Sequence, residues 1–169
     1  MVAGLEQRDG GRHVTRVTYA THVEAPPERV WRVVADPRRL PRWERHIDAV
    51  VDVPPDGLRE GSTYTVVLSF LAVRARVRAT VRAWEPPRRA VVELSGPVLR
   101  AVVTTTVEPE DEGSVLRHEV EYRFGRGSLG RLAARSLQLL GGAELALRYG
   151  TQAQRRDAEG AERATRRGR

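Results

Sequence analysis

The longest helical pattern in the chain covers residues 128–154. Apolar and small residues recur there at steps of three and four, which places an apolar stripe along one side of a helix. The stripe comprises Leu129, Leu132, Ala133, Ser136, Leu140, Ala143 and Leu147. Ser128 is a suitable N-cap, and Gly141 and Gly142 each cost roughly 1 kcal/mol relative to alanine, which favours a kink there. The pattern predicts a long helix that packs its stripe against a sheet.

Alternation of apolar and polar residues predicts six to seven strands upstream of this helix. The clearest alternation covers residues 73–84 and is typical of an antiparallel sheet with one dry face. We expect an inward set of Val73, Ala75, Val77, Ala79, Val81 and Ala83, and an outward set of Arg74, Arg76, Arg78, Thr80, Arg82 and Trp84. Other strands are expected at residues 13–24, 47–53, 62–70, 90–94, 98–107 and 115–124.

Two short helices are predicted after the first strand, at residues 28–35 and 38–45, each introduced by proline. Short turns between consecutive strands, with helices segregated from them, predict an α+β fold. We expect a flexible leader over residues 1–12, a single domain over residues 13–154 and a disordered basic tail over residues 155–169.

Composition narrows the classes of function. The chain of 169 residues has no cysteine, which excludes disulfides and thiolate chemistry. Its net charge is +7, but no aromatic residues interleave with the basic ones, so nucleic acid is not predicted as a partner. No segment approaches the roughly 20 apolar residues that cross a bilayer, and no signal peptide is evident. A cytoplasmic location is expected.

Several stretches carry a resemblance to a known family. They are residues 21–31 (THVEAPPERVW), Ala35-Asp36-Pro37, residues 40–43 (LPRW), Gly61 and residues 84–87 (WEPP). With this order of elements, residues 14–154 resemble the START/Bet v 1-like (SRPBCC) superfamily, in particular its bacterial polyketide cyclase/dehydrase branch. The resemblance implies a helix-grip fold, in which a curved antiparallel sheet wraps around the C-terminal helix and encloses an apolar cavity. Members bind lipids, sterols, quinones or polyketides, and some catalyse aldol cyclisation or dehydration.

The family has no single catalytic motif, so most candidate site residues are chosen by the face of the sheet that each is expected to occupy. Trp43 and Leu140 come from the predicted helices. His118 alternates with charged residues and shares its phase with Leu116, Val120 and Tyr122, so it should point inward. There it acts as an acid/base, orients a ligand carbonyl, or is a structural histidine. Inward hydroxyl groups are typical of ligand sites. The expected ligand-binding residues are Tyr19, Thr21, Trp43, Tyr64, Val66, Leu68, Val77, Ala79, Thr105, His118 and Leu140.

Other kinds of site have less support. His13, His22, His46 and His118 lie on separate elements without metal-ligand spacing, so neither a metal nor another cofactor is expected. His46 either lies near the cavity entrance that the resemblance implies or is simply exposed, and Trp31 is expected to belong to the core. The arginines at positions 74, 76, 78 and 82 are expected to face solvent. They could make transient contact with phosphates or an anionic membrane, or they could protect a sheet edge.

Three functions therefore remain open from the sequence. The first is a carrier or sensor that binds a hydrophobic or aromatic small molecule that is lipid-, quinone- or polyketide-like. The second is a polyketide cyclase/dehydratase whose catalytic residues are His118, Tyr64 and Tyr122. No arginine or carboxylate is predicted to point inward beside His118, except Arg100 if a bulge reverses the alternation of its strand, and this counts against the enzyme. The third is an interaction protein with a basic surface. Both a monomer and a homodimer are compatible with the sequence.

Overall fold

The computed structural model describes residues 3–9, 12–70, 73–125, 127–139 and 142–167. The strands are β1 (Ala3–Asp9), β2 (Arg12–Val23), β3 (Ile47–Val51), β4 (Thr63–Phe70), β5 (Val73–Glu85), β6 (Arg89–Ser95), β7 (Leu99–Glu110) and β8 (Gly113–Phe124). The helices are α1 (Pro27–Val34), the 3-10 turn η1 (Pro37–Arg39), α2 (Leu40–Trp43), α3 (Ser128–Leu139) and α4 (Gly142–Arg167).

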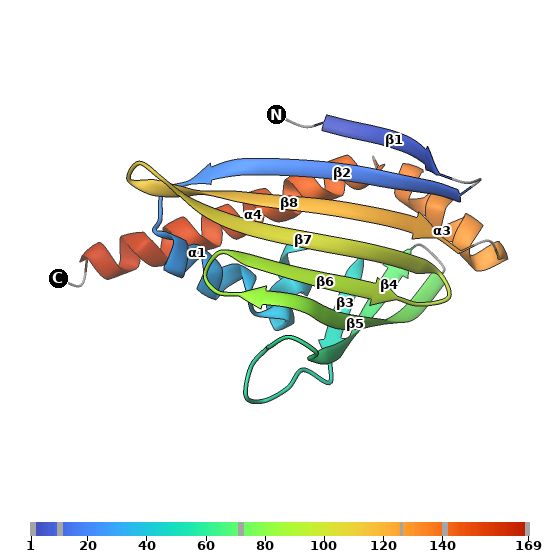
Figure 1. Cartoon of the computed structure of the whole chain (residues 1–169), viewed down its shortest axis with the longest axis horizontal. Coiled ribbons are helices and arrows are strands. Elements are labelled where there is room, and N and C mark those ends of the chain that lie inside the picture. Colours follow the sequence, from blue (N-terminus) through green and yellow to red (C-terminus); the bar gives the residue numbers. More distant parts are fainter. Residues whose placement is uncertain (1–2, 10–11, 71–72, 126, 140–141, 168–169) are drawn as a thin grey trace.

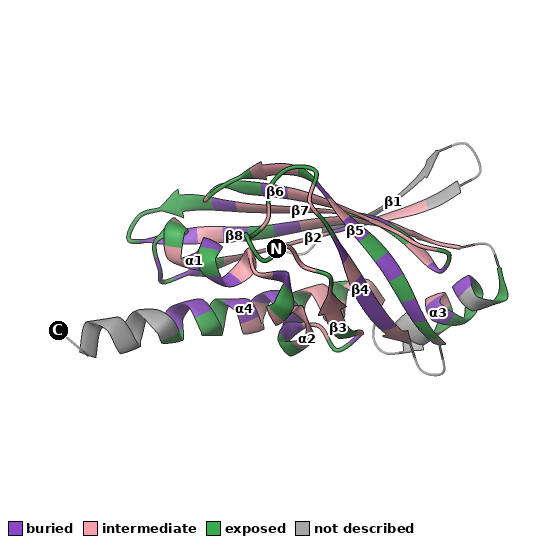
Figure 2. Cartoon of the chain, turned by 90° about the horizontal axis from the view of Figure 1, so that it is seen from below, coloured by how far each residue is buried: buried purple, intermediate pink, exposed green. Residues whose placement is uncertain are grey.

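The strands form one antiparallel sheet in the order β1-β2-β8-β7-β6-β5-β4-β3. The sheet curls, and α1, α2 and α4 all lie on the same side of it (Figures 1 and 2). Helix α4 packs against β2, α1 and α2. This arrangement is the predicted helix-grip fold of the α+β class, with the two short helices placed between the first long strand and β3.

The core consists of two apolar clusters at opposite ends of the sheet. One joins β4 and β5 to α3 and includes Val66, Val77, Ala79 and Ala133. The other joins α1 to α4 and includes Val23, Val30, Trp31, Leu116 and Ala158. Full burial of one such valine or leucine contributes roughly 1.5–3 kcal/mol, so both clusters stabilise the grip of the sheet on the helices.

Both chain ends differ from the expectation of disorder. Residues 3–9, expected in a flexible leader, form β1, which pairs along β2 from Ala3–Thr18 to Asp9–Arg12. Residues 155–167, expected in a disordered tail, continue α4. Ala158 is fully buried there. The high charge of the tail misled the prediction, because its few inward positions continue the helical spacing of Leu147 at steps of three and four.

The long helical pattern is divided between α3 and α4, as the two glycines suggested. Gly142 has a φ of 77°, in the left-handed region that glycine adopts without a steric penalty. Leu132, expected in the apolar stripe, is 41% exposed, whereas Ala133 of the same stripe is fully buried. Leu140 and Gly141 lie outside the described residues.

Candidate ligand-binding site

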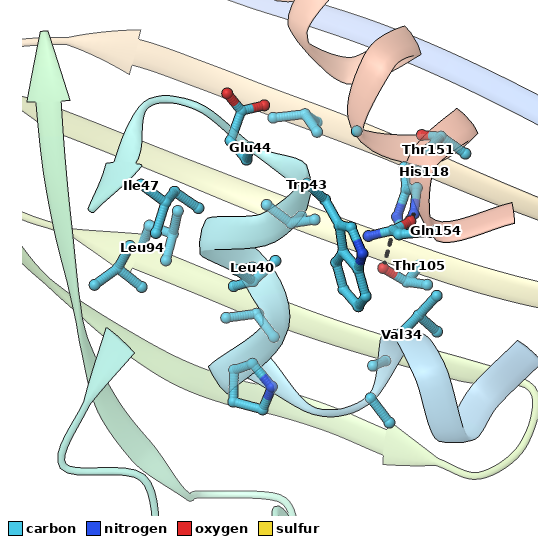
Figure 3. Close-up of a pocket in the computed structure, with 18 of the residues that line it drawn as sticks. Val34, Leu40, Trp43, Glu44, Ile47, Leu94, Thr105, His118, Thr151 and Gln154 are labelled. Atoms are coloured by element: carbon cyan, nitrogen blue, oxygen red, sulfur yellow. Dashed lines mark hydrogen bonds between the residues drawn. The ribbon is translucent and has the colours of Figure 1, made fainter. Parts of the chain in front are cut away.

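A cavity of about 260 Å³ lies between the sheet, the α1–α2 segment and α4 (Figure 3). Its floor consists of two cross-strand rows on β6, β7 and β8. The rows are Val92–Val103–Val120 and Ala90–Thr105–His118. Because side chains alternate along a strand, these rows lie two residues apart on one face. The floor is apolar except where Thr105 and His118 stand side by side.

Helix α4 provides the opposite wall. Leu147, Thr151 and Gln154 line the cavity at steps of four and three residues. The Thr151 hydroxyl donates to the Leu147 carbonyl oxygen at 2.8 Å, so its proton is used within the helix. Gln154 is therefore the residue through which α4 presents a polar group to the cavity.

All three tryptophans of the protein line the cavity. The rings of Trp31 and Trp84 are 5.1 Å apart between centroids and inclined at 59°. The indole Nε1 of Trp43 donates a hydrogen bond to Asp157 Oδ2 on α4 at 2.9 Å. Trp31, expected in the core, is both buried and part of this wall.

Trp84 was expected to face solvent, and that expectation is wrong. The pairing of β5 with β6 shifts between Val81 and Ala83, so that two residues of β5 lie opposite one of β6. Such a β-bulge reverses the inward and outward phase of the residues that follow it. Trp84 consequently pairs with Ala90 and turns toward the cavity.

His118 is held by hydrogen bonds at both ring nitrogens. Nδ1 lies 2.9 Å from Thr105 Oγ1, and Nε2 lies 2.7 Å from Gln154 Oε1. An amide oxygen only accepts, so Nε2 carries the proton and Nδ1 accepts the Thr105 hydroxyl proton. Burial lowers the pKa of His118, against a smaller opposing effect of the Gln154 hydrogen bond. The imidazole is therefore neutral at neutral pH.

In this arrangement the Gln154 amide faces His118 with its oxygen. With Oε1 bound to His118, the NH₂ group of Gln154 is the end that remains for another acceptor. Tyr64 lies on the cavity wall as well, and burial raises the pKa of its hydroxyl to about 12. Tyr64 thus stays a neutral hydroxyl. Glu44 is the one carboxylate among the described lining residues, and they include no arginine.

The structure brings together part of the predicted ligand-binding set. Five of its members line the cavity: Trp43, Tyr64, Val66, Thr105 and His118. Leu68, Val77 and Ala79 belong to the packed core beside α3 instead, because that helix covers their part of the sheet. Leu140 lies outside the described residues.

Three other predicted residues lie away from the cavity lining. Tyr19 faces α4, where its hydroxyl accepts from Gln152 Nε2 at 3.4 Å. The Thr21 hydroxyl donates to the His22 carbonyl oxygen at 3.4 Å. Tyr122, predicted as catalytic, packs edge-on against Phe124 with ring centroids 5.7 Å apart. These three residues lie on the inner face of the sheet but outside the cavity lining. The alternation of residues along a strand predicts which face a side chain occupies, and it does not predict where along the sheet the cavity lies.

His46 is buried, so the exposed alternative is wrong. It is 6% exposed, and its backbone N–H donates to the Glu44 carboxylate at 3.2 Å. Sequence reasoning missed Gln154 and Thr151, although the helical spacing extended from Leu147 predicts that both share its face.

Within the described ranges, no group of three or more metal-ligating side chains is gathered in one place. None of the helices described is long and apolar enough to cross a membrane.

A curled antiparallel sheet that encloses a cavity against a C-terminal helix defines the helix-grip class of ligand-binding domains. Residues 14–148 match the family described as polyketide cyclase/dehydrase and lipid transport. The chain belongs to this family, within the START/Bet v 1-like superfamily.

Individual relatives agree with this assignment. The uncharacterized protein Rv1546 of Mycobacterium tuberculosis is 31% identical over 125 residues, which cover 72% of this chain and 87% of that protein. TTHA0849 from Thermus thermophilus superposes with a TM-score of 0.66 at 21% identity, covering 86% of this chain and 98% of its own. The Zhui aromatase/cyclase from Streptomyces sp. R1128 superposes with a TM-score of 0.69 at 14% identity. The superposition covers 87% of this chain and 94% of that protein. At these identities the two structures support the fold alone.

Proposed function

We propose that the protein is a carrier or sensor for a neutral, mostly apolar small molecule that bears a hydrogen-bond acceptor oxygen. The observation that carries this proposal is the Thr105–His118–Gln154 chain of hydrogen bonds, which leaves the Gln154 NH₂ group as a donor on the lining of a mostly apolar cavity. Ligand sites of this kind combine an apolar wall with a few placed polar groups that orient the ligand. The lipid-transport part of the family description is consistent with such a role.

The charges at the cavity favour a neutral ligand. An anion transferred into an apolar site needs a cationic partner, and none is provided by the described lining residues, since His118 is neutral. The Glu44 carboxylate would repel a ligand carboxylate further. We therefore expect ketones, quinones, esters or alcohols in preference to free fatty acids.

The cavity volume limits the size of the ligand. An apolar cavity of about 150 Å³ is large enough to bind benzene. The cavity of about 260 Å³ therefore suits two fused rings, or an acyl chain of similar volume. Three indole rings in the wall give an aromatic ligand several faces on which to stack.

The cyclase/dehydratase alternative makes a different demand on His118. A general base needs a nitrogen within hydrogen-bond reach of the substrate proton. Here both ring nitrogens are bound to Thr105 and Gln154, and Tyr122 is not among the lining residues. Catalysis would require His118 to break one of these hydrogen bonds, whereas ligand binding leaves both of them intact.

Native mass spectrometry of the purified protein, followed by organic extraction, tests the proposal. We expect a bound, neutral, oxygen-containing compound that is released on denaturation. A compound that the protein converts into a different product on incubation would favour the enzyme. A protein that carries no compound and takes up no neutral aromatic ketone would contradict the proposal.

A further inference from the structure

A row of arginines crosses the outer face of the sheet, away from the cavity. Arg78 on β5, Ser95 on β6, Arg100 on β7 and Arg123 on β8 are successive cross-strand partners. These four strands lie side by side in Figure 1. Since neighbouring strands are about 4.8 Å apart, the row spans about 14 Å at the backbone. Arg78 and Arg100 are exposed and Arg123 is half-buried. We call Arg78, Arg100 and Arg123 the outer arginine row.

Among the described residues, none forms an ion pair with the outer arginine row. The acidic side chains that flank the row pair with other arginines: Asp52 with Arg76 at 3.7 Å, Glu93 with Arg82 at 2.7 Å, and Glu121 with Arg16. The three guanidinium groups therefore keep their charge and hydrogen-bond donors available to an external anion.

The fold itself does not explain this row. The edges of the described sheet are β1 and β3, so arginines on β5, β7 and β8 protect no edge. Arg100 and Arg123 lie directly opposite each other, and like charges in that position destabilise a sheet. A cationic cluster that opposes folding favours a role in binding.

We propose that the outer arginine row docks the protein on the surface of an anionic lipid bilayer. Anionic headgroups present negative charge in a plane, which matches three cations spread across a broad sheet face. Each basic residue near such a surface strengthens partitioning about fivefold, so the row contributes about a hundredfold. The row lies on the face opposite the cavity, so this docking does not depend on the proposed ligand.

The side chains around the row favour a bilayer over nucleic acid. Proteins that bind single strands stack bases on aromatic side chains. Among the residues whose burial the structure describes, no aromatic side chain lies in this row. The tryptophans and Tyr64 face the cavity on the other side of the sheet. Val102, two residues from Arg100, is 38% exposed and adds an apolar contact that a headgroup region accommodates.

Co-sedimentation of the full chain with vesicles tests the proposal. Vesicles of equimolar phosphatidylglycerol and phosphatidylcholine should bind the protein, and vesicles of phosphatidylcholine alone should not. The combined variant Arg78→Gln, Arg100→Gln, Arg123→Gln should lose about a hundredfold in partitioning, and Arg100→Gln alone about fivefold. Because the variant removes a like-charge pair, its melting temperature should not fall below that of the wild type.

A matched control separates the row from net charge. Arg32, Arg59 and Arg88 are exposed and lie outside the sheet face that carries the row. Changing these three to glutamine removes the same charge and should retain most of the vesicle binding. Equal losses in the two triple variants, no binding by the wild type, or tighter binding to a DNA duplex than to anionic vesicles would each overturn the proposal.

Discussion

Trp43 on α2 and Asp157 on α4 are joined by a hydrogen bond of 2.9 Å between the indole Nε1 and a carboxylate oxygen. The two residues are separated by 114 positions in the sequence. Trp43 is 6% exposed and lines the cavity, whereas Asp157 lies one turn beyond Gln154. The bond therefore ties the short helices over the cavity to the helix that carries the polar group.

Asp157→Ala should loosen the attachment of α2 to α4. We expect the free energy of unfolding to fall by about 1 kcal/mol, the usual net contribution of a hydrogen bond, and a bound ligand to dissociate faster. Stopped-flow release of a neutral aromatic ketone, followed by the fluorescence of the three tryptophans, measures the second effect. Asp157→Asn keeps an acceptor oxygen and should behave almost as the wild type. Unchanged release from Asp157→Ala would show that α2 does not control the cavity.

His118 should make stability depend on pH on the acid side of neutrality. Its folded pKa is lowered from 6.5 by burial, so the unfolded chain binds more protons than the folded one below that pH. The free energy of unfolding should consequently fall as the pH decreases through about 6.5 toward the lowered pKa of the folded state. Urea unfolding at a series of pH values measures this slope.

The control for this effect is His118→Asn, which has no titrating group at the position. The variant should be less stable than the wild type at neutral pH, because Thr105 and Gln154 lose their shared partner. Its stability should nevertheless decline less steeply on acidification. Parallel slopes for the two proteins would mean that His118 is not the group responsible.

Two phenylalanine substitutions distinguish the cavity from the packed core. Ala79 is fully buried in the core beside α3, so Ala79→Phe should cost typically 1–3 kcal/mol through overpacking. Val103 lies on the cavity floor, so Val103→Phe should fill space and reduce ligand affinity at least tenfold, with a smaller loss of stability. Urea unfolding and ligand titration of both variants check this. If Ala79→Phe instead lost ligand affinity and Val103→Phe lost stability, the binding site would lie beside α3.

Strand alternation predicted His118 correctly as an inward residue because β8 pairs with β7 without a register shift over its whole length. The same reasoning failed for Trp84, because a bulge between Val81 and Ala83 leaves no mark in the pattern of apolar and polar residues. The sequence predicts the phase of a strand only as far as its first irregularity. The fold class was predictable, since it rests on many residues rather than on one.

Gln154 illustrates a different limit. Its helical spacing was readable, but a glutamine near a charged tail is typical of an exposed surface. Only the placement of α4 across the sheet brings it to 2.7 Å from His118, 36 residues earlier in the chain. Conversely, Tyr19 and Tyr122 were predicted in the site because phase says which face a residue occupies, and not which part of that face is hollow.

The most direct test of the account is calorimetric titration of acetylnaphthalene and ethylnaphthalene, which differ chiefly in a carbonyl oxygen. The wild type should bind the ketone several-fold more tightly, since one net hydrogen bond contributes about 0.5–1.5 kcal/mol. Gln154→Leu should bind both compounds with similar affinity. If the ketone is preferred equally by both proteins, or if neither compound binds the wild type, the Thr105–His118–Gln154 chain of hydrogen bonds does not select the ligand.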